Sequence, residues 1–485
     1  MRNLLKSITT RALITLGLLT VGLSCAVNPV TGKKELMLMS EQQEIALGIQ
    51  SDPEVVASFG LFESPAIQAF ISDKGAKMAA VSHRSNLEYH FKVLDSPVVN
   101  AFALPGGYVY FTRGIMAHFN NEAEFAGVLG HEIGHVTARH GARQQTTQIL
   151  GQAGLIFGLI ISKDFAQFAD VASQALGLLF LKFSREHETE SDRLGVEYST
   201  KIGYDAREMA GFFQTIKRLS GDQGGIPTFM STHPDPLDRY NTVGKLAVEW
   251  QQKAGGTNFN VNRDAYLRMI DGIVYGEDPR QGYVENNVFY HPELKFQFPV
   301  PAAWKVQNMP TQVQIAPSDG KALLLFNLAQ EKDLRSAADA TVAKDSLRQV
   351  EPAQVVTVNG LSGVRILADQ VNPQNNTTIR LQIYLIQYSN VIYRFYGMSY
   401  LADFNTYQPA FLQTMQNFKG LTDQSKINVT PEKIKVRQVT ADATLAAALR
   451  SFNMPENRLA ELAIVNGMEL TTPVTKGMLI KTVVK

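Results

Sequence analysis

Cysteine and charge imbalance are what this sequence most clearly lacks. Its 485 residues contain a single cysteine, Cys25. No disulfide can therefore form within the chain, so its domains depend on their hydrophobic cores and on any bound metal. The 46 basic and 45 acidic residues leave a formal net charge of +1, which excludes the strongly basic balance typical of nucleic-acid-binding proteins. The length predicts about two to four domains.

Long hydrophobic runs are also missing. Residues 154–162 and 175–183 are the most apolar stretches after the N-terminus, and each is well short of the roughly 20 residues that a membrane-spanning helix needs. We expect them to form core helices that cover a cleft. A hairpin that touches the bilayer or a partner protein is the alternative.

The N-terminal residues have the pattern of an export signal. Basic residues at positions 2, 6 and 11 precede an apolar run over 12–23, which is too short to span a bilayer. Ser24 and Cys25 resemble a bacterial lipobox, although Gly22 stands where that pattern prefers leucine. We predict that 1–25 is a signal peptide whose Cys25 is lipidated, so that lipid alone attaches the protein to the membrane. By resemblance to bacterial lipoproteins, Ala26 in place of an aspartate after the cysteine favours attachment to the outer membrane. The alternative is a plain signal peptide that is cleaved nearby without lipidation.

Residues 127–141, GVLGHEIGHVTARHG, carry the clearest chemical signal. The apolar periodicity predicts a helix from Asn120 to His140, ended by Gly141 as a C-cap. On that helix two histidines lie four residues apart on one flank, and a glutamate follows the first of them. His140 projects from the other side of the predicted helix and is not expected to be a ligand.

This spacing predicts a zinc site. His131 and His135 can direct two imidazole nitrogens at one metal ion, and Glu132 can act as a general base. Burial in an apolar sector raises the pKa of such a carboxyl group toward the useful range. The alternative is a buried helix with two hydrogen-bonded histidines, which would leave Glu132 without a partner. Three glycines, at 127, 130 and 134, indicate that another element packs closely against this helix.

A catalytic zinc site needs a third protein ligand and an open position. Residues 183–205 form a second amphipathic helix, on which Glu188 and Asp192 are four apart on one face. One of these acids can bind the metal while the other orients a ligand histidine through its second nitrogen. Spacing alone leaves His187 and Glu190 open as further candidates.

Four segments, NAFALPGG, HEIGH, SREHETESD and THPDPLDR, occur in an order that resembles the zinc metallopeptidase family of the CAAX prenyl protease, HtpX and periplasmic BepA. The resemblance covers roughly residues 30–255 and implies a gluzincin fold, mainly helical around a small sheet. It implies that Glu188 is the third metal ligand and that Asp192 holds a ligand histidine through its second ring nitrogen. Ser191 stands where the family usually has alanine.

The same resemblance implies roles for three further residues. Asn100 and its neighbouring backbone lie along the sheet edge that holds substrate. His233 and Arg239 lie near the metal, where they stabilise the oxyanion or block the site at rest. The absence of membrane spans makes the exported BepA type the closer match, but no repeat of about 34 residues follows the peptidase segment.

The remaining chain predicts two more domains. After a helical linker at 261–284, strand-like segments and helices at 334–348 and 404–418 predict an α+β domain over 285–422. Residues 430–485 resemble a LysM-like βααβ module, although Ala443 departs from its usual turn. The expected fold is thus α+β and multidomain, with a zinc peptidase domain at 26–260.

The expected function is that of a zinc endopeptidase with one zinc per chain. The resemblance implies that it cleaves misfolded or misassembled envelope proteins on the periplasmic face of the cell envelope. The alternative is a latent zinc-containing chaperone or assembly factor for outer-membrane proteins. Further predicted partners are the outer-membrane assembly machinery and, through the LysM-like module, peptidoglycan. No nucleic-acid partner is expected.

Overall fold

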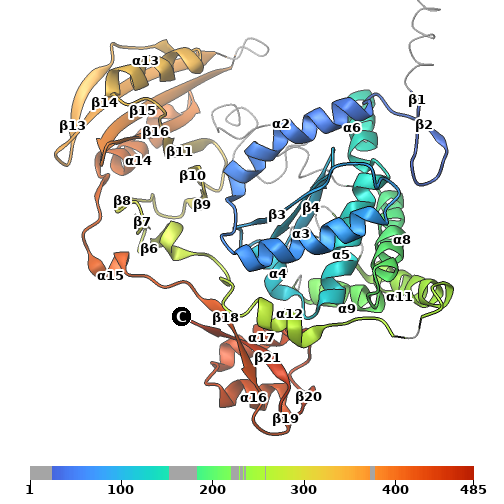
Figure 1. Ribbon diagram of the computed structural model, residues 1–485. Coiled ribbons are helices and arrows are strands. Elements are labelled where there is room, and N and C mark those ends of the chain that lie inside the picture. Colours follow the sequence, from blue (N-terminus) through green and yellow to red (C-terminus); the bar gives the residue numbers. More distant parts are fainter. Residues whose placement is uncertain are drawn as a thin grey trace, which may run out of the picture.

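The computed structural model describes residues 25–151, 183–219, 229, 233, 236–256, 258–371 and 377–485. The predicted signal segment before Cys25 and the apolar stretches at 154–162 and 175–182 lie outside these ranges. The protein is a mixed helix-and-sheet, multidomain molecule (Figure 1). Within the described ranges, no helix is both long and apolar enough to cross a membrane.

The N-terminal half is mainly helical and surrounds a small three-stranded sheet (Figure 1). The sheet has the order β3-β5-β4, with β3 parallel and β4 antiparallel to β5, so β4 is an edge strand. Alternating apolar residues predict strands around Phe91 and Tyr110, and β3 and β5 confirm them. The elements are β1 (Cys25–Val27), β2 (Lys34–Leu36), α2 (Glu41–Phe59), α3 (Pro65–Ala80), β3 (His90–Leu94), β4 (Ala101–Leu104), β5 (Tyr108–Thr112), α4 (Arg113–His118), α5 (Glu122–Thr137), α6 (His140–Gly151), α8 (Arg185–Lys201), α9 (Arg207–Leu219), α11 (Pro236–Lys253) and α12 (Arg263–Met269).

Local hydrogen bonds define where the helices begin. Ser40 and Gln43 form a capping box at the start of α2, as their spacing of three residues predicts. The Ser184 side chain accepts a hydrogen bond from the His187 N–H at the start of α8. Such caps satisfy N–H groups that have no partner inside the helix. Asn121 caps α5 in the same way by accepting from the Glu124 N–H.

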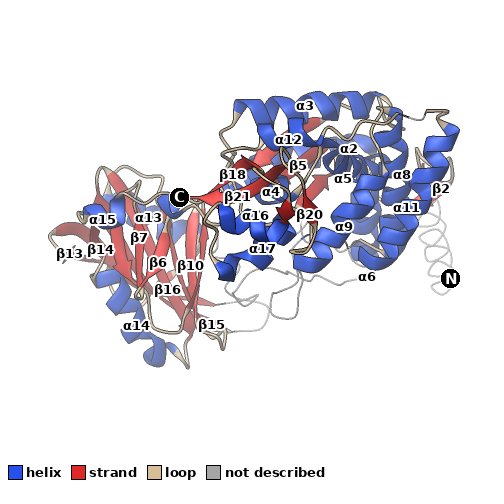
Figure 2. Cartoon of the chain, turned by 90° about the horizontal axis from the view of Figure 1, so that it is seen from below, coloured by secondary structure: helices blue, strands red, loops and turns tan. Residues whose placement is uncertain are grey.

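Two antiparallel sheets and three α-helices follow the helical N-terminal half. The larger sheet has a core on each face, one beneath α13 and one beneath α14 (Figure 2). The predicted helices and the strand-like segments are therefore confirmed, while the domain boundaries stay predictions. The elements are the short 3-10 helix η1 (Pro279–Gln281), β6 (Tyr283–Glu285), β7 (Val288–His291), β8 (Phe296–Pro299), β9 (Lys305–Met309), β10 (Gln312–Ala316), β11 (Ala322–Leu328), α13 (Leu334–Lys344), β12 (Arg348–Gln349), β13 (Gln354–Val358), β14 (Leu361–Val371), β15 (Thr378–Tyr388), β16 (Val391–Tyr400), α14 (Phe404–Gln416), β17 (Lys419–Gly420) and α15 (Gln424–Ile427).

The C-terminal segment packs against the helical half. Its elements are β18 (Lys433–Gln438), β19 (Ala443–Thr444), α16 (Leu445–Ser451), η2 (Glu456–Arg458), α17 (Leu459–Val465), β20 (Pro473–Val474) and β21 (Leu479–Val484). Its hydrophobic residues join the same core as those of α5 and α9. The buried Lys481 ammonium donates to the carbonyls of Ala117 and Phe119, at 2.9 and 3.0 Å. The LysM-like assignment of this segment stays a prediction.

Candidate metal centre

Helix α5 is the central element of the site, because every one of its 16 residues is buried. Its glycines allow α8 to approach closely, as predicted: a Cβ on Gly130 would lie 2.9 Å from the Gly195 carbonyl oxygen. A Cβ on Gly134 would lie 3.2 Å from the Cα of Ser191. The glycines thus bring the HEIGH segment against the acidic helix that carries Glu188.

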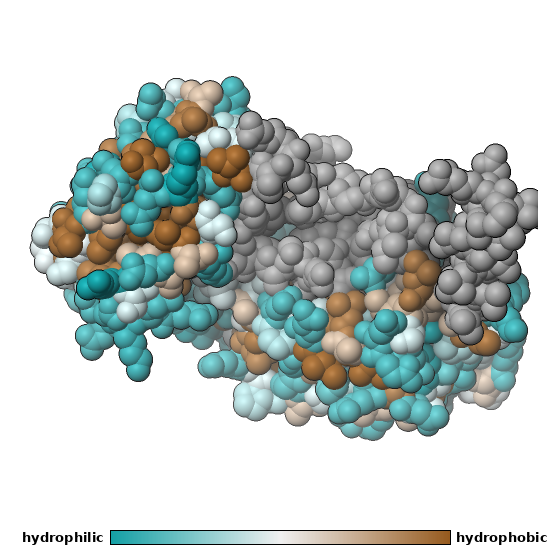
Figure 3. Space-filling model, turned by 90° about the horizontal axis from the view of Figure 1, so that it is seen from above, coloured by the Kyte–Doolittle hydropathy of each residue, from teal (hydrophilic) through white to brown (hydrophobic). Residues whose placement is uncertain are grey.

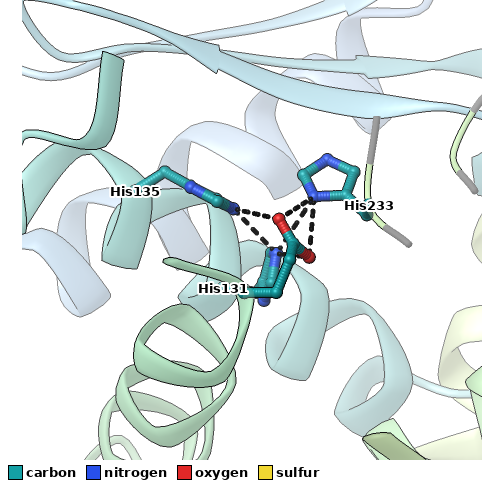
Figure 4. Close-up of side chains that lie close together, drawn as sticks. His131, His135 and His233 are labelled. Atoms are coloured by element: carbon teal, nitrogen blue, oxygen red, sulfur yellow. Dashed lines mark hydrogen bonds and ion pairs between the residues drawn. The ribbon is translucent and has the colours of Figure 1, made fainter. Parts of the chain in front are cut away.

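Three side chains converge between these two helices. The Nε2 atoms of His131 and His135 lie 2.9 Å apart. Oε2 of Glu188 lies 3.5 Å from Nε2 of His131, and Oε1 of Glu188 lies 3.5 Å from Nε2 of His135. Figure 4 shows that the two imidazoles point toward one another and toward a common centre.

His233 brings a fourth donor atom from a distant part of the sequence. Its Nδ1 lies 3.3 Å from Nε2 of His131 and 3.1 Å from Oε1 of Glu188 (Figure 4). The four donor atoms all lie within 4.8 Å of one another. Two nitrogen ligands of one tetrahedral zinc ion lie about 3.3 Å apart, given Zn–N bonds of about 2.0–2.1 Å. The spacing and the mix of imidazole and carboxylate donors therefore fit zinc.

The acidic neighbour of the cluster orients one histidine. Oδ1 of Asp192 lies 2.9 Å from Nδ1 of His131, which leaves Nε2 of that ring facing the other donors. Arg239 donates to both Asp192 oxygens, at 2.7 and 2.8 Å, and lies 3.1 Å from Glu188. Although burial alone would raise the pKa of Asp192, Arg239 and His131 lower it to about 2. Asp192 is thus held ionised, as carboxylate partners of metal-bound histidines are.

Glu132 lies beside the cluster but has no hydrogen bond to any described residue. Its side chain is fully buried, and its nearest charged partner is Nε2 of His233 at 3.7 Å. Burial raises the pKa of the Glu132 carboxyl group. An unpartnered buried carboxylate is costly for folding, so a role in chemistry explains its retention better than packing does.

The predicted C-terminal end of this helix is wrong. Helix α5 ends at Thr137, and Arg139 has a positive φ of 57° that turns the chain before α6 begins at His140. Gly141 lies inside α6 and is no C-cap. Because of this turn, His140 does not project from the far side of one continuous helix.

His140 instead contacts the second nitrogen of a ligand candidate. Its Nδ1 lies 3.0 Å from Nδ1 of His135, and its Nε2 lies 3.1 Å from Glu190. His187 stacks on the His140 ring at 4.3 Å. His187 and Glu190, which spacing left open, thus surround His140 and are not part of the four-residue cluster. No sequence signal marks the turn at Arg139, since arginine is not typical of the left-handed region.

The other two predicted site residues lie apart from the four donors. Asn100 directly precedes edge strand β4 and is buried, and its carbonyl accepts from the Thr112 N–H. Cys25 opens β1 and pairs with Leu36.

The sequence matches the family model "Peptidase family M48" over residues 65–247. A beta-barrel assembly-enhancing protease of Yersinia pestis is 30% identical over 352 residues, covering 70% of this chain and 68% of the relative. The chain belongs to peptidase family M48. Its similarity to this relative extends well beyond the residues that match the family model.

Shorter matches agree with this assignment. The mitochondrial metalloendopeptidase OMA1 of Arabidopsis thaliana is 34% identical over 171 residues, covering 35% of this chain and 34% of that protein. A beta-barrel assembly-enhancing protease of Escherichia coli is 26% identical over 219 residues, or 44% and 45% of the two chains. As a member of family M48, the protein is a zinc-dependent metalloendopeptidase.

Proposed function

We propose that this protein hydrolyses peptide bonds in misfolded or misassembled proteins of the bacterial cell envelope, with zinc held by His131, His135 and Glu188. The observation that carries the proposal is the buried Glu132 carboxylate, which lies beside the donor cluster without a hydrogen bond. Zinc, when bound, supplies Lewis-acid chemistry that polarises the carbonyl of the scissile bond.

The protein's own residues supply the proton transfers. Glu132 takes a proton from the attacking water and passes it to the leaving amine, and its raised pKa suits both transfers. Asp192 holds the His131 ring in the ligand orientation. Arg239 keeps the Asp192 and Glu188 carboxylates ionised and in place.

The cellular setting rests on the relatives. Two bacterial relatives are named beta-barrel assembly-enhancing proteases, which supports a substrate among outer-membrane proteins and contact with their assembly machinery. Lipidation of Cys25 would tether the protein to the outer membrane at its periplasmic face. A Cys25→Ala protein that stays in the membrane fraction would contradict this attachment.

The test of the activity is casein cleavage by the protein without its first 25 residues. Wild type is compared with Glu132→Gln, and bound zinc is counted in both. We expect equal zinc and cleavage by wild type alone. Cleavage by both proteins would contradict the role of Glu132, and the absence of cleavage by either would favour the second function below.

The second function is that of a latent chaperone or assembly factor for outer-membrane proteins. The position of His233 favours it, because a fourth protein ligand closes a zinc site that must keep one position open for catalysis. In this resting state His233 would block the site, and a client would have to displace it. We expect His233→Ala to cleave casein faster than wild type if this state dominates. An unchanged or lower rate would count against latency.

A further inference from the structure

A groove with a volume of about 900 Å³ lies between the peptidase segment and the β-sheets that follow it. One wall comes from the end of α2 and the segment around Asn100, and the other comes from strands β7 to β11. The segment before β6, around Glu277, joins the two walls. No residue of the proposed zinc cluster lines this groove.

Exposed hydrophobic side chains gather in the groove. The described chain exposes thirteen large hydrophobic side chains, and five of them line this one feature. Each of the five is 39–46% exposed: Leu61, Val98, Val284, Leu294 and Leu328. They come from separate segments of the chain, so the fold itself gathers them. The upper face of the molecule shows hydrophobic side chains scattered among hydrophilic ones (Figure 3). The gathering of several exposed apolar side chains in one groove is typical of a binding site.

Side-chain amides that each have one atom without a hydrogen bond line the same groove. Three buried acceptor atoms have no hydrogen bond within the described chain: Asn100 Oδ1, Gln307 Oε1 and Gln312 Oε1. One buried donor atom, Asn327 Nδ2, also has no hydrogen bond there. Asn100, Gln312 and Asn327 are only 3–6% exposed. Buried polar groups almost always have partners. An extended polypeptide presents N–H and C=O groups alternately and can satisfy both kinds.

The charges in the groove select against acidic ligands. Four acidic residues line it, and Arg113 is the single lysine or arginine among its lining residues. Asp95 is paired with Arg113, and Asp278 is paired with Arg280, which lies outside the lining. Glu277 and Glu293 therefore leave an excess of negative charge in the groove. Segments that carry aspartate or glutamate would be repelled.

Edge strand β4 connects the groove to the metal centre. Asn100 and Phe102 line the groove, while Leu104 lies with His135 around a small cavity at the other end of the strand. Four strand residues span roughly 10 Å. A polypeptide that pairs with the outer edge of β4 therefore passes from one site to the other, as strand addition to a sheet edge allows.

From these observations we infer that the groove binds an extended, apolar segment of the substrate polypeptide that lacks acidic side chains, at a distance from the bond that is cleaved. The inference rests on the proposed function, because it takes the ligand of the groove to be part of the chain that enters the metal centre. Only a long unfolded chain can occupy the groove and the metal centre at the same time. Such chains would therefore be better substrates than short peptides.

The test is a binding measurement on the zinc-loaded Glu132→Gln chain, in which cleavage does not interfere. The probe is a fluorescein-labelled peptide of about fifteen alternating leucine and serine residues, which spans roughly 50 Å when extended. Fluorescence anisotropy gives its affinity for three proteins: the Glu132→Gln chain, the same chain with Val284→Lys and Leu328→Lys, and a control with Val350→Lys and Val355→Lys. The control valines are exposed residues of the same sheet domain that do not line the groove.

We expect the groove variant to bind the probe about tenfold more weakly and the control to bind it unchanged. We also expect a probe with glutamate in place of serine to bind the unsubstituted groove weakly. Equal affinity of the groove variant and the control, or equal binding of the acidic probe, would overturn the inference. If the wild-type protein cleaves no peptide, the proposed function fails, while the binding measurement still decides whether the groove holds such a segment.

Discussion

The carboxylate of Asp192 lies 2.9 Å from Nδ1 of His131 and also binds Arg239 through both oxygens. This contact fixes the tautomer and the orientation of the His131 ring, so that Nε2 faces the other donor atoms. The arrangement is a carboxylate–histidine pair supported in turn by an arginine, and such outer partners tune metal affinity.

Replacement of Asp192 by asparagine should weaken zinc binding by about 10- to 100-fold, because the His131 ring loses its charged partner. Zinc affinity is measured by competition with a chromogenic chelator. Asp73→Asn is the matched control, since Asp73 is half exposed and pairs with Lys77 on the surface of α3. Equal affinity of the two variants would contradict the role of Asp192.

Replacement of Gly130 by alanine should destabilise the protein by about 1–3 kcal/mol, because the new methyl group would press on the backbone of Gly195. The helical control is Gly211→Ala in α9, where nothing lies within 4 Å of the added carbon. That control should be stabilised by about 0.5–1 kcal/mol through its better helix propensity. Urea unfolding of both variants checks the prediction, and a stabilised Gly130→Ala would refute the close packing of α5 on α8.

Replacement of Lys481 by alanine should loosen the C-terminal segment. The buried ammonium donates to two carbonyl oxygens at the end of α4, and its removal takes this donor away from both acceptors. Burial lowers the pKa of Lys481 to about 7 and raises that of Glu124 to about 8. A buried acceptor that loses its donor costs about 1–3 kcal/mol.

Limited proteolysis and urea unfolding measure this effect. Lys485→Ala, at an exposed position on the same end of the chain, should leave both measurements unchanged. A C-terminal segment that resists protease equally in both variants would show that Lys481 does not hold it in place.

His118 should make the protein less stable in mild acid. Burial lowers its pKa in the folded protein to about 4, whereas a histidine in the unfolded chain has its ordinary pKa of 6.5. Below pH 6.5 the histidine of the unfolded chain binds a proton, whereas the buried histidine of the folded chain stays neutral. The free energy of unfolding therefore falls as the pH drops toward about 4.

Between pH 7 and pH 5, wild type should lose about 2 kcal/mol more than His118→Gln, at about 1.4 kcal/mol per pH unit below the unfolded pKa. Urea unfolding at the two pH values gives this difference, and any loss of zinc affects both proteins alike. Equal losses in the two proteins would contradict the prediction.

Periodicity and spacing along the chain predicted the local parts of this molecule. The caps at Ser40 and Ser184, the strands around Phe91 and Tyr110, and the shared face of Glu188 and Asp192 all depend on interactions within a few residues. Such interactions are encoded in neighbouring side chains and can be predicted without knowledge of the rest of the fold.

The sequence by itself therefore determined that two helices would carry a histidine pair and an acid pair with matching spacing, and that glycines would let another element pack closely against the first helix. Only the tertiary structure decided that the turn at Arg139 places His140 against His135. It also brought His233 into the cluster from about a hundred residues away, where periodicity and spacing gave no signal and only the family resemblance had placed it near the metal. The groove likewise gathers exposed side chains from several separate segments of the chain. These contacts join residues far apart in sequence, where packing of the whole chain, and not local periodicity, fixes which side chains meet.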